Sequence, residues 1–112
     1  MSVIAKTLVP SAQAPAANTT QYTAPAATRT IIDKFTATNT TGAGATLTVF
    51  LVTAAGAAVA ANTIISAQAL AAGQCYTCPE LVGHVLNPGD FIVTASSVNL
   101  ALTIRSSGRE VT

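Results

Sequence analysis

The apolar residues of this chain lie in short runs that alternate with polar residues, and turn-forming residues separate these runs. Alternation of apolar and polar residues predicts half-buried strands, whereas clusters of Gly, Pro and Asn predict turns. The clearest run is 45–52 (ATLTVFLV), in which Leu47, Val49 and Leu51 are separated by single residues. No stretch is typical of a helix of about ten residues. The sequence therefore predicts an all-β fold: an antiparallel β-sandwich, jelly-roll-like, with about seven or eight short strands.

Two predictions concern the first long strand, at 28–39. Residues 39–44 (NTTGAG) form a strong turn signal between this strand and 45–52, which predicts that the two strands pair as a hairpin. Within the strand, Ile31 and Ile32 place bulky side chains on both faces. A bulge near this pair would reconcile the two residues with a single buried face.

Local residue chemistry predicts three further features. Asn87-Pro88-Gly89-Asp90 suits a type II turn, because Gly in the third position accepts a positive φ angle. The alanine-rich stretch 54–61 is expected to be a loop, since Gly56 interrupts it and so short a helix is marginal by itself. A last long strand is expected over 100–106, ending before Gly108, with three side chains pointing inward: Leu100, Leu102 and Ile104.

The shortage of charge is the strongest indication of function. Charged residues make up 8% of the chain, against about 25% in an ordinary soluble domain. The five Lys and Arg and four Asp and Glu residues are spread singly, so direct nucleic-acid binding is not expected. Polar Thr, Gln, Asn or Gly interrupts every apolar stretch, so no membrane span is expected either. The 23 Ala and 18 Thr residues make a plain surface. Such a surface favours a domain that is largely covered by other protein over a freely soluble monomer.

The first twenty residues differ in composition from the rest. Residues 10–20 (PSAQAPAANTT) are small and interrupted by proline, which favours an extended linker. The sequence thus divides into an N-terminal extended arm, 1–20, and an antiparallel β-sandwich domain, 21–112. The arm could be a disordered tail, or it could add a strand to the sheet edge of a neighbouring protein. We favour docking, and the candidate interface residues are Val3, Ile4, Leu8 and Val9.

Cys75 and Cys78 form a C-x-x-C pair, the one motif that invites a chemical function. A thioredoxin-like site needs a helix after the motif, and a structural zinc site needs four ligands. No helix is predicted here, and His84 is the one histidine of the chain. We expect small buried or half-buried thiols, with a disulfide or a metal or redox role as alternatives. The start MSVIAK does not resemble a signal peptide, which predicts synthesis in a cytoplasm and reduced cysteines.

The polar residues do not predict catalysis. The four carboxylates are scattered, and no Ser-His-Asp arrangement or phosphate-binding glycine loop is recognisable. The chain is therefore expected to be no enzyme and to need no cofactor and no metal.

From Tyr22 to the C-terminus, the chain resembles small virion structural proteins of tailed bacteriophages. The segments that carry the resemblance are Tyr22-Thr23-Ala24-Pro25, Thr30-Ile31-Ile32, Thr36-Ala37-Thr38-Asn39-Thr40, residues 46–52 (TLTVFLV), Leu81-x-Gly83-His84-x-Leu86-x-x-Gly89-Asp90 and Ser106-x-Gly108-x-Glu110-Val111-Thr112. The opening arm and the cysteine pair lie outside it. The resemblance implies an antiparallel sandwich, assembly into a particle and no catalysis.

The leading functional prediction is a capsid decoration or cement protein. It would bind and stabilise the major capsid protein lattice on the capsid exterior of a virion assembled in a bacterial host cytoplasm. Copies of the chain would associate as a dimer or trimer at local symmetry axes. Two alternatives stay open: a tail, baseplate or head–tail connector component, and a carbohydrate-binding β-sandwich module.

Overall fold

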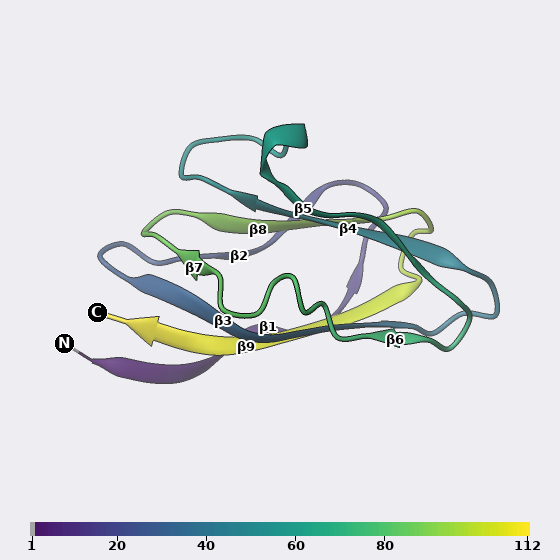
Figure 1. Cartoon of the computed structure of the whole chain (residues 1–112), viewed down its shortest axis with the longest axis horizontal. Helices are drawn as coiled ribbons and strands as arrows, with labels where there is room; N and C mark the ends of the chain where they lie inside the picture. Colours follow the sequence, from purple (N-terminus) through teal and green to yellow (C-terminus); the bar gives the residue numbers. More distant parts are fainter. Residues whose placement is uncertain (1) are drawn as a thin grey trace.

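The computed structural model describes residues 2–112, which form nine strands in two antiparallel sheets packed face to face (Figure 1). This confirms the all-β sandwich. The strands are β1 (Val3–Ala14), β2 (Thr19–Thr23), β3 (Arg29–Asn39), β4 (Ala45–Val52), β5 (Thr63–Leu70), β6 (Cys75–Tyr76), β7 (Val85–Leu86), β8 (Phe91–Ser96) and β9 (Leu102–Val111). Sheet 1 has the order β1-β9-β3-β6, with β7 also paired to β3, and sheet 2 has the order β2-β8-β4-β5.

The strand pairing is nested along the chain. The first strand pairs with the last, β2 pairs with β8, β3 pairs with β7 and β6, and β4 pairs with β5. Successive pairs lie alternately in sheet 1 and sheet 2, as in one long hairpin rolled around a core. This is the jelly-roll arrangement, and it confirms that part of the sequence prediction.

The core lies between the sheets and is made of small and branched apolar side chains with a single aromatic ring, Phe35. Alternate residues of each long strand supply it, and its largest fully buried members also include Ile32, Leu47, Leu70, Leu81, Leu86, Ile92, Leu102 and Ile104. The alternation that predicted the strands is therefore the alternation that builds the core.

The expected hairpin between β3 and β4 is wrong. These strands lie in different sheets, and residues 40–44 cross from one sheet to the other. The buried Asn39 holds the crossing, because its Nδ2 donates to the carbonyl oxygens of Ala43 (2.7 Å) and Leu70 (3.1 Å). Turn chemistry shows that the chain reverses, but it does not choose the partner strand. Here β3 pairs along its length with β9, and β4 pairs with β8 and β5.

The N-terminal segment differs from the expected arm outside the domain, because residues 3–14 form β1 of the chain's own sandwich. This strand pairs with β9 from Val3 opposite Val111 to Ala14 opposite Leu102. Its register shifts between Thr7 and Val9 and again before Ala12, and these bulges hide the strand pattern in the sequence. Pro10 is tolerated because β1 lies at the edge of sheet 1, where a missing N–H costs no ladder bond.

The expected bulge in β3 is confirmed. Ile32 lies opposite Gly108 and Lys34 lies opposite Ser107, so Asp33 is the extra residue. The last strand does not end before Gly108, as predicted, but continues to Val111. A Cβ atom on Gly108 would overlap the Ile31 carbonyl oxygen, so the bulge is accommodated by the missing side chain.

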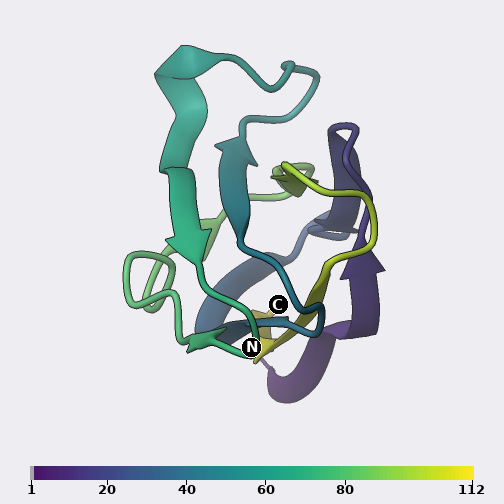
Figure 2. The same ribbon diagram turned by 90° about the vertical axis from the view of Figure 1, so that its right-hand side faces the viewer.

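Of the remaining local predictions, the turn and the loop are confirmed and the inward position of Leu100 is wrong. The type II turn is confirmed, since Gly89 has a φ of 87° and the Asp90 N–H donates to the Asn87 carbonyl at 2.9 Å. The stretch 54–61 is a loop that ends in one short 3₁₀ turn, η1 (Ala60–Asn62), and it stands on the far side of sheet 2 from sheet 1 (Figure 1, Figure 2). Leu100 does not point inward; it is 45% exposed in a left-handed turn before β9.

Both described ends of the chain lie at the same end of the sandwich (Figure 1). The backbone of Ser2 pairs with that of Thr112 through two hydrogen bonds of 3.1 and 2.9 Å. Residues 2–112 contain no helix of the length and apolarity needed to span a bilayer.

Candidate functional site

The outer face of sheet 1 collects most of the charged side chains. Inward positions of β3 and β9 belong to the core, so the alternating positions face solvent. These outward positions, with the bulge residue of β3, carry Arg29, Asp33, Lys34, Arg105 and Arg109. Four of the five Lys and Arg residues, which are scattered along the sequence, are thereby gathered on one face.

One of these cations is neutralised locally. Arg109 binds Asp33 through two parallel hydrogen bonds, Nη2 to Oδ1 at 2.9 Å and Nε to Oδ2 at 3.0 Å. The hydrogen bond and the charge of Asp33 hold the pKa of the Arg109 guanidinium above its usual range. Among residues 2–112, no carboxylate lies within ion-pair distance of Arg29, Lys34 or Arg105.

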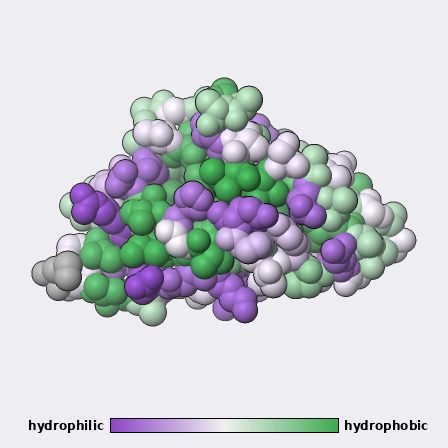
Figure 3. Space-filling model, viewed as in Figure 1, coloured by the Kyte–Doolittle hydropathy of each residue, from purple (hydrophilic) through white to green (hydrophobic). Residues whose placement is uncertain are grey.

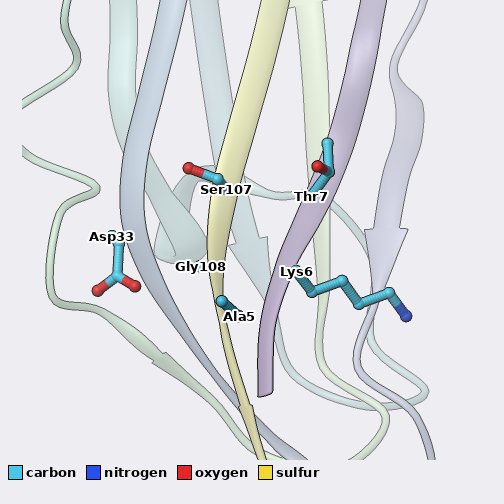
Figure 4. A pocket seen from close by; sticks show the side chains of 6 residues that line it. All are labelled: Ala5, Lys6, Thr7, Asp33, Ser107 and Gly108. Carbon is cyan, nitrogen blue, oxygen red and sulfur yellow. The ribbon is translucent and has the colours of Figure 1, made fainter.

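Two shallow depressions mark this face. The first, of about 170 Å³, is lined by Lys34, Thr36, Arg105, Ser106 and Ser107. The second, of about 330 Å³, crosses β1, β9 and β3. In this second depression Asp33 and Lys6 stand on opposite flanks, with short side chains between them, and the Lys6 chain extends away from Asp33 (Figure 4). Hydroxyl groups and cations, but few bulky groups, therefore form this surface.

Apolar side chains accompany the cations at the end of the sheet where the termini lie. Val3 of β1 is 54% exposed and Val85 of β7 is 51% exposed. Strand register places Val3 opposite Val111 and Val85 opposite the half-buried Ile31. Figure 3, which views the sandwich from its edge, shows hydrophobic patches between hydrophilic ones toward the end of the molecule where the chain ends lie.

The outer side of sheet 2 is different, because it carries no charged side chain on β2, β4, β5 or β8. Phe50 and Phe91 are half-buried there, on neighbouring strands. Val52 and Val93 are buried but lie outside the core between the sheets. A Cβ atom on Gly56 would lie 3.3 Å from Val52 Cγ1, so the 53–62 loop partly covers this face.

Tyr22 joins the two sheets near the chain ends. Its hydroxyl, on β2, donates to Glu110 Oε2 of β9 at 2.6 Å and lies 2.8 Å from Thr30 Oγ1 of β3. Lys6 completes the cluster with an ion pair of 3.1 Å to the same Glu110 oxygen. Burial, and then the Glu110 hydrogen bond, raises the pKa of Tyr22 to about 12, while the Tyr22 hydrogen bond lowers the pKa of Glu110. This cluster closes one end of the sandwich.

The four predicted interface residues do not share one surface. Leu8 and Val9 are 4% and 2% exposed and pack in the chain's own core. Val3 and Ile4 are exposed, at 54% and 58%. An interface role stays a prediction for Val3 and Ile4, whereas the apolar surface of Leu8 and Val9 is already buried within the fold. The cationic face was not predicted, because β3 and β9 are far apart in the sequence and only their pairing brings its residues together.

The two cysteines lie in different environments. Cys75 is exposed on β6, whereas Cys78 is buried after it, and both are free thiols. Burial raises the pKa of the Cys78 thiol to about 12, which opposes thiolate chemistry at neutral pH. Within residues 2–112, no group of three His, Cys, Asp or Glu residues is arranged to hold a metal ion.

Each carboxylate of the chain has a partner in the fold. Asp33 binds Arg109, Glu110 binds Tyr22 and Lys6, and Glu80 accepts a hydrogen bond of 2.6 Å from Tyr76. The remaining one, Asp90, accepts from two backbone N–H groups, those of Ala54 and Asn87, at 3.0 Å each, as expected of a residue that stabilises its turn.

Comparisons with known proteins give a distant structural likeness. No protein-family model matches the chain, and no curated protein matches it either. Among solved structures, it is similar to a chain in the structure of the infectious bursal disease virus Gx strain, at 22% sequence identity and a TM-score of 0.45. The match covers 97% of this chain and 32% of that chain, so this chain spans about a third of the length of its structural neighbour.

Proposed function

We propose that the chain is a non-enzymatic structural protein of a virion, and that it decorates and stabilises a capsid lattice from the capsid exterior. The observation that carries this proposal is the nested strand pairing, because double-sheet jelly rolls recur in viral capsid proteins and in lectins. The separate partnering of the four carboxylates supports a role without catalysis.

The mechanism we propose is cross-bridging. A decoration protein stabilises a shell by burying surface at many repeated sites, each contact modest and the sum large. The uncharged outer side of sheet 2, with the 53–62 loop, is suited to contacts between copies, since no charged group would have to be desolvated there. Dimers or trimers built in this way would sit on local symmetry axes of a major capsid protein lattice.

The test is recovery of the protein from purified particles. A virus or prophage encoding the chain would be grown in its bacterial host, and separated heads and tails would be analysed by quantitative mass spectrometry. We expect the chain in heads, released by mild denaturant before the shell dissociates. Recovery in tails alone would refute decoration and support a tail, baseplate or connector role, whereas absence from both fractions would refute the virion role.

A carbohydrate-binding module is the second candidate, and one observation favours it. Phe50 and Phe91 lie on the outer face of sheet 2, where Phe50 opposes Val93 and Phe91 opposes Val52, so the two rings are diagonal neighbours. Thr46 and Thr48 continue the same face on β4. Aromatic rings beside hydroxyls could stack on a sugar. Glycan-array binding that is lost in Phe50→Ala and Phe91→Ala, but kept in Val59→Ala, would support this candidate over decoration.

A further inference from the structure

The cationic outer face of sheet 1 is an interaction surface for which the fold itself provides no partner. Its four cations and one anion give it a net charge of +3, while Lys6, Glu80, Asp90 and Glu110 elsewhere sum to −2. We propose that this face docks on an acidic protein surface, with Arg29, Lys34 and Arg105 meeting carboxylates around an apolar contact. This docking proposal rests on the proposed function in one respect only, that the acidic surface is taken to belong to a capsid shell.

The 170 Å³ depression on this face is lined by hydrogen-bond donors. Strand register places Lys34 opposite Ser107 and Thr36 opposite Arg105, and all four line the 170 Å³ depression. An ammonium, a guanidinium and two hydroxyls around one hollow can donate several hydrogen bonds to a carboxylate, and charge assistance strengthens them. Arg105 already donates to Ser11 Oγ at 3.0 Å, which orients the guanidinium beside the hollow.

Within residues 2–112, the fold leaves most cations of this face without an anionic partner. Arg109 is paired with Asp33, but within residues 2–112 the other three cations of the face have no such partner. Like charges on one face repel one another and are relieved by an anionic neighbour. Charge complementarity of this kind steers association and selects the partner.

The apolar residues of this face favour an acidic protein over nucleic acid as the partner. Beside the cations lie Ile31, Val85 and Val3, and Val85 and Val3 are about half exposed. Protein interfaces combine an apolar centre with a polar rim, and this face has both elements. A phosphate backbone would instead call for a basic stripe, and single strands for aromatic stacking platforms. The outward positions of β3 and β9 carry no aromatic residue.

The test uses two anionic probes with the isolated protein. One is a synthetic peptide of alternating glutamate and leucine, and the other is a DNA duplex of equal total charge. Titrations are followed by ¹H–¹⁵N NMR, which locates binding, and by calorimetry at two salt concentrations. We expect the peptide to shift amides of β3, β7 and β9 but not those of β4 and β5, and to bind less tightly as salt rises.

Matched variants then separate the contributions. Lys34→Gln/Arg105→Gln is expected to weaken peptide binding about tenfold, because two exposed charge contacts with the peptide are lost. Lys6→Gln removes a cation at the flank of the second depression that is already paired with Glu110, and it should change binding by less than about twofold. Val85→Ser should weaken peptide binding, whereas Val59→Ser, equally exposed in the 53–62 loop, should not. Circular dichroism confirms that each variant is folded.

Three results would overturn the proposal. The duplex could bind more tightly than the peptide with no effect of Val85→Ser, which would make the face a phosphate-binding surface. The second is that the control variants weaken binding as much as the test variants do. The third is that neither probe binds at low salt. These results can be told apart from a failure of the proposed function. If the peptide binds but the protein is absent from particles, the docking surface is kept and the virion role is rejected. If the Lys34→Gln/Arg105→Gln variant is incorporated into particles as well as the wild type, docking through this face is refuted.

Discussion

Replacing Gly108 with alanine should destabilise the protein through a clash in the middle of sheet 1. The added Cβ atom would overlap the Ile31 carbonyl oxygen and lie 3.0 Å from Leu8 Cδ1. Ile31 cannot move aside easily, because its strand is paired with β9 on one side and with β7 on the other. Overpacking costs about 1–3 kcal/mol, and a displaced strand also loses a ladder hydrogen bond worth about 1 kcal/mol. We expect a loss of about 2–4 kcal/mol and a Tm lower by roughly 10–20 °C.

Two other glycines provide controls that separate steric clash from backbone conformation. A Cβ on Gly42 would meet nothing within 4 Å, so Gly42→Ala should change stability by less than about 0.5 kcal/mol. Gly73 has open space but a φ of 75°, so Gly73→Ala should cost about 1–2 kcal/mol through conformation alone.

Urea denaturation followed by far-UV circular dichroism measures all three changes. The m-value should stay constant if each variant unfolds from the same compact state. The reasoning is refuted if Gly108→Ala loses no more stability than Gly42→Ala. It is also refuted if the order of Gly108→Ala and Gly73→Ala is reversed, because the clash would then be relieved by a strand shift that the pairing on both sides of β3 should prevent.

Three further predictions test the fold. Leu8→Ala should lower the free energy of unfolding by about 2–4 kcal/mol in urea denaturation, because Leu8 is buried in the core. Val3→Ala, at an exposed position of the same strand, should lower it by less than about 0.5 kcal/mol. Equal losses in the two variants would contradict the assignment of β1 to the sandwich. Asn39→Ala should cost about 2–3 kcal/mol because it removes the buried side-chain amide that donates to the Ala43 and Leu70 carbonyls, and an unchanged denaturation midpoint would contradict this. Because the pKa of Glu110 is lowered from 4.5 in the folded state, chiefly by Tyr22, its stabilising contribution is present above pH 4.5 and is lost as the pH falls through the folded pKa. Glu110→Gln should therefore show a shallower acid dependence of unfolding free energy than the wild type, and identical pH profiles would refute the assignment.

The class of fold could be predicted from the local pattern of residues. The run 45–52 is a strand with those bounds, because side-chain alternation is a local property that the pleated strand converts directly into one buried face. The turn at Gly89 and the bulge at Asp33 were predictable for the same reason, since each depends on residues next to one another in the chain.

Which strands are neighbours depends on contacts between segments that are far apart in the chain. The turn signal after Asn39 is real, yet β3 and β4 separate into different sheets because pairing with β9 and β8 buries both of them. The N-terminal segment shows the same limit. Two bulges in β1 break the alternation that would have identified it, and the strand is recognisable only beside β9, to which it contributes Leu8 and Val9.

The cationic outer face of sheet 1 also depends on the pairing of strands that are far apart in the chain. Charge shortage was evident from composition, but the placement of the charges was not. Asp33 and Arg109 are 76 residues apart in the chain and form a bidentate pair, and Lys34 and Arg105 line one hollow because their strands pair. The composition predicts a surface that is largely covered by other protein, but it does not say which face would be covered. The face that carries the cations follows from long-range strand register, which no local pattern of residues encodes.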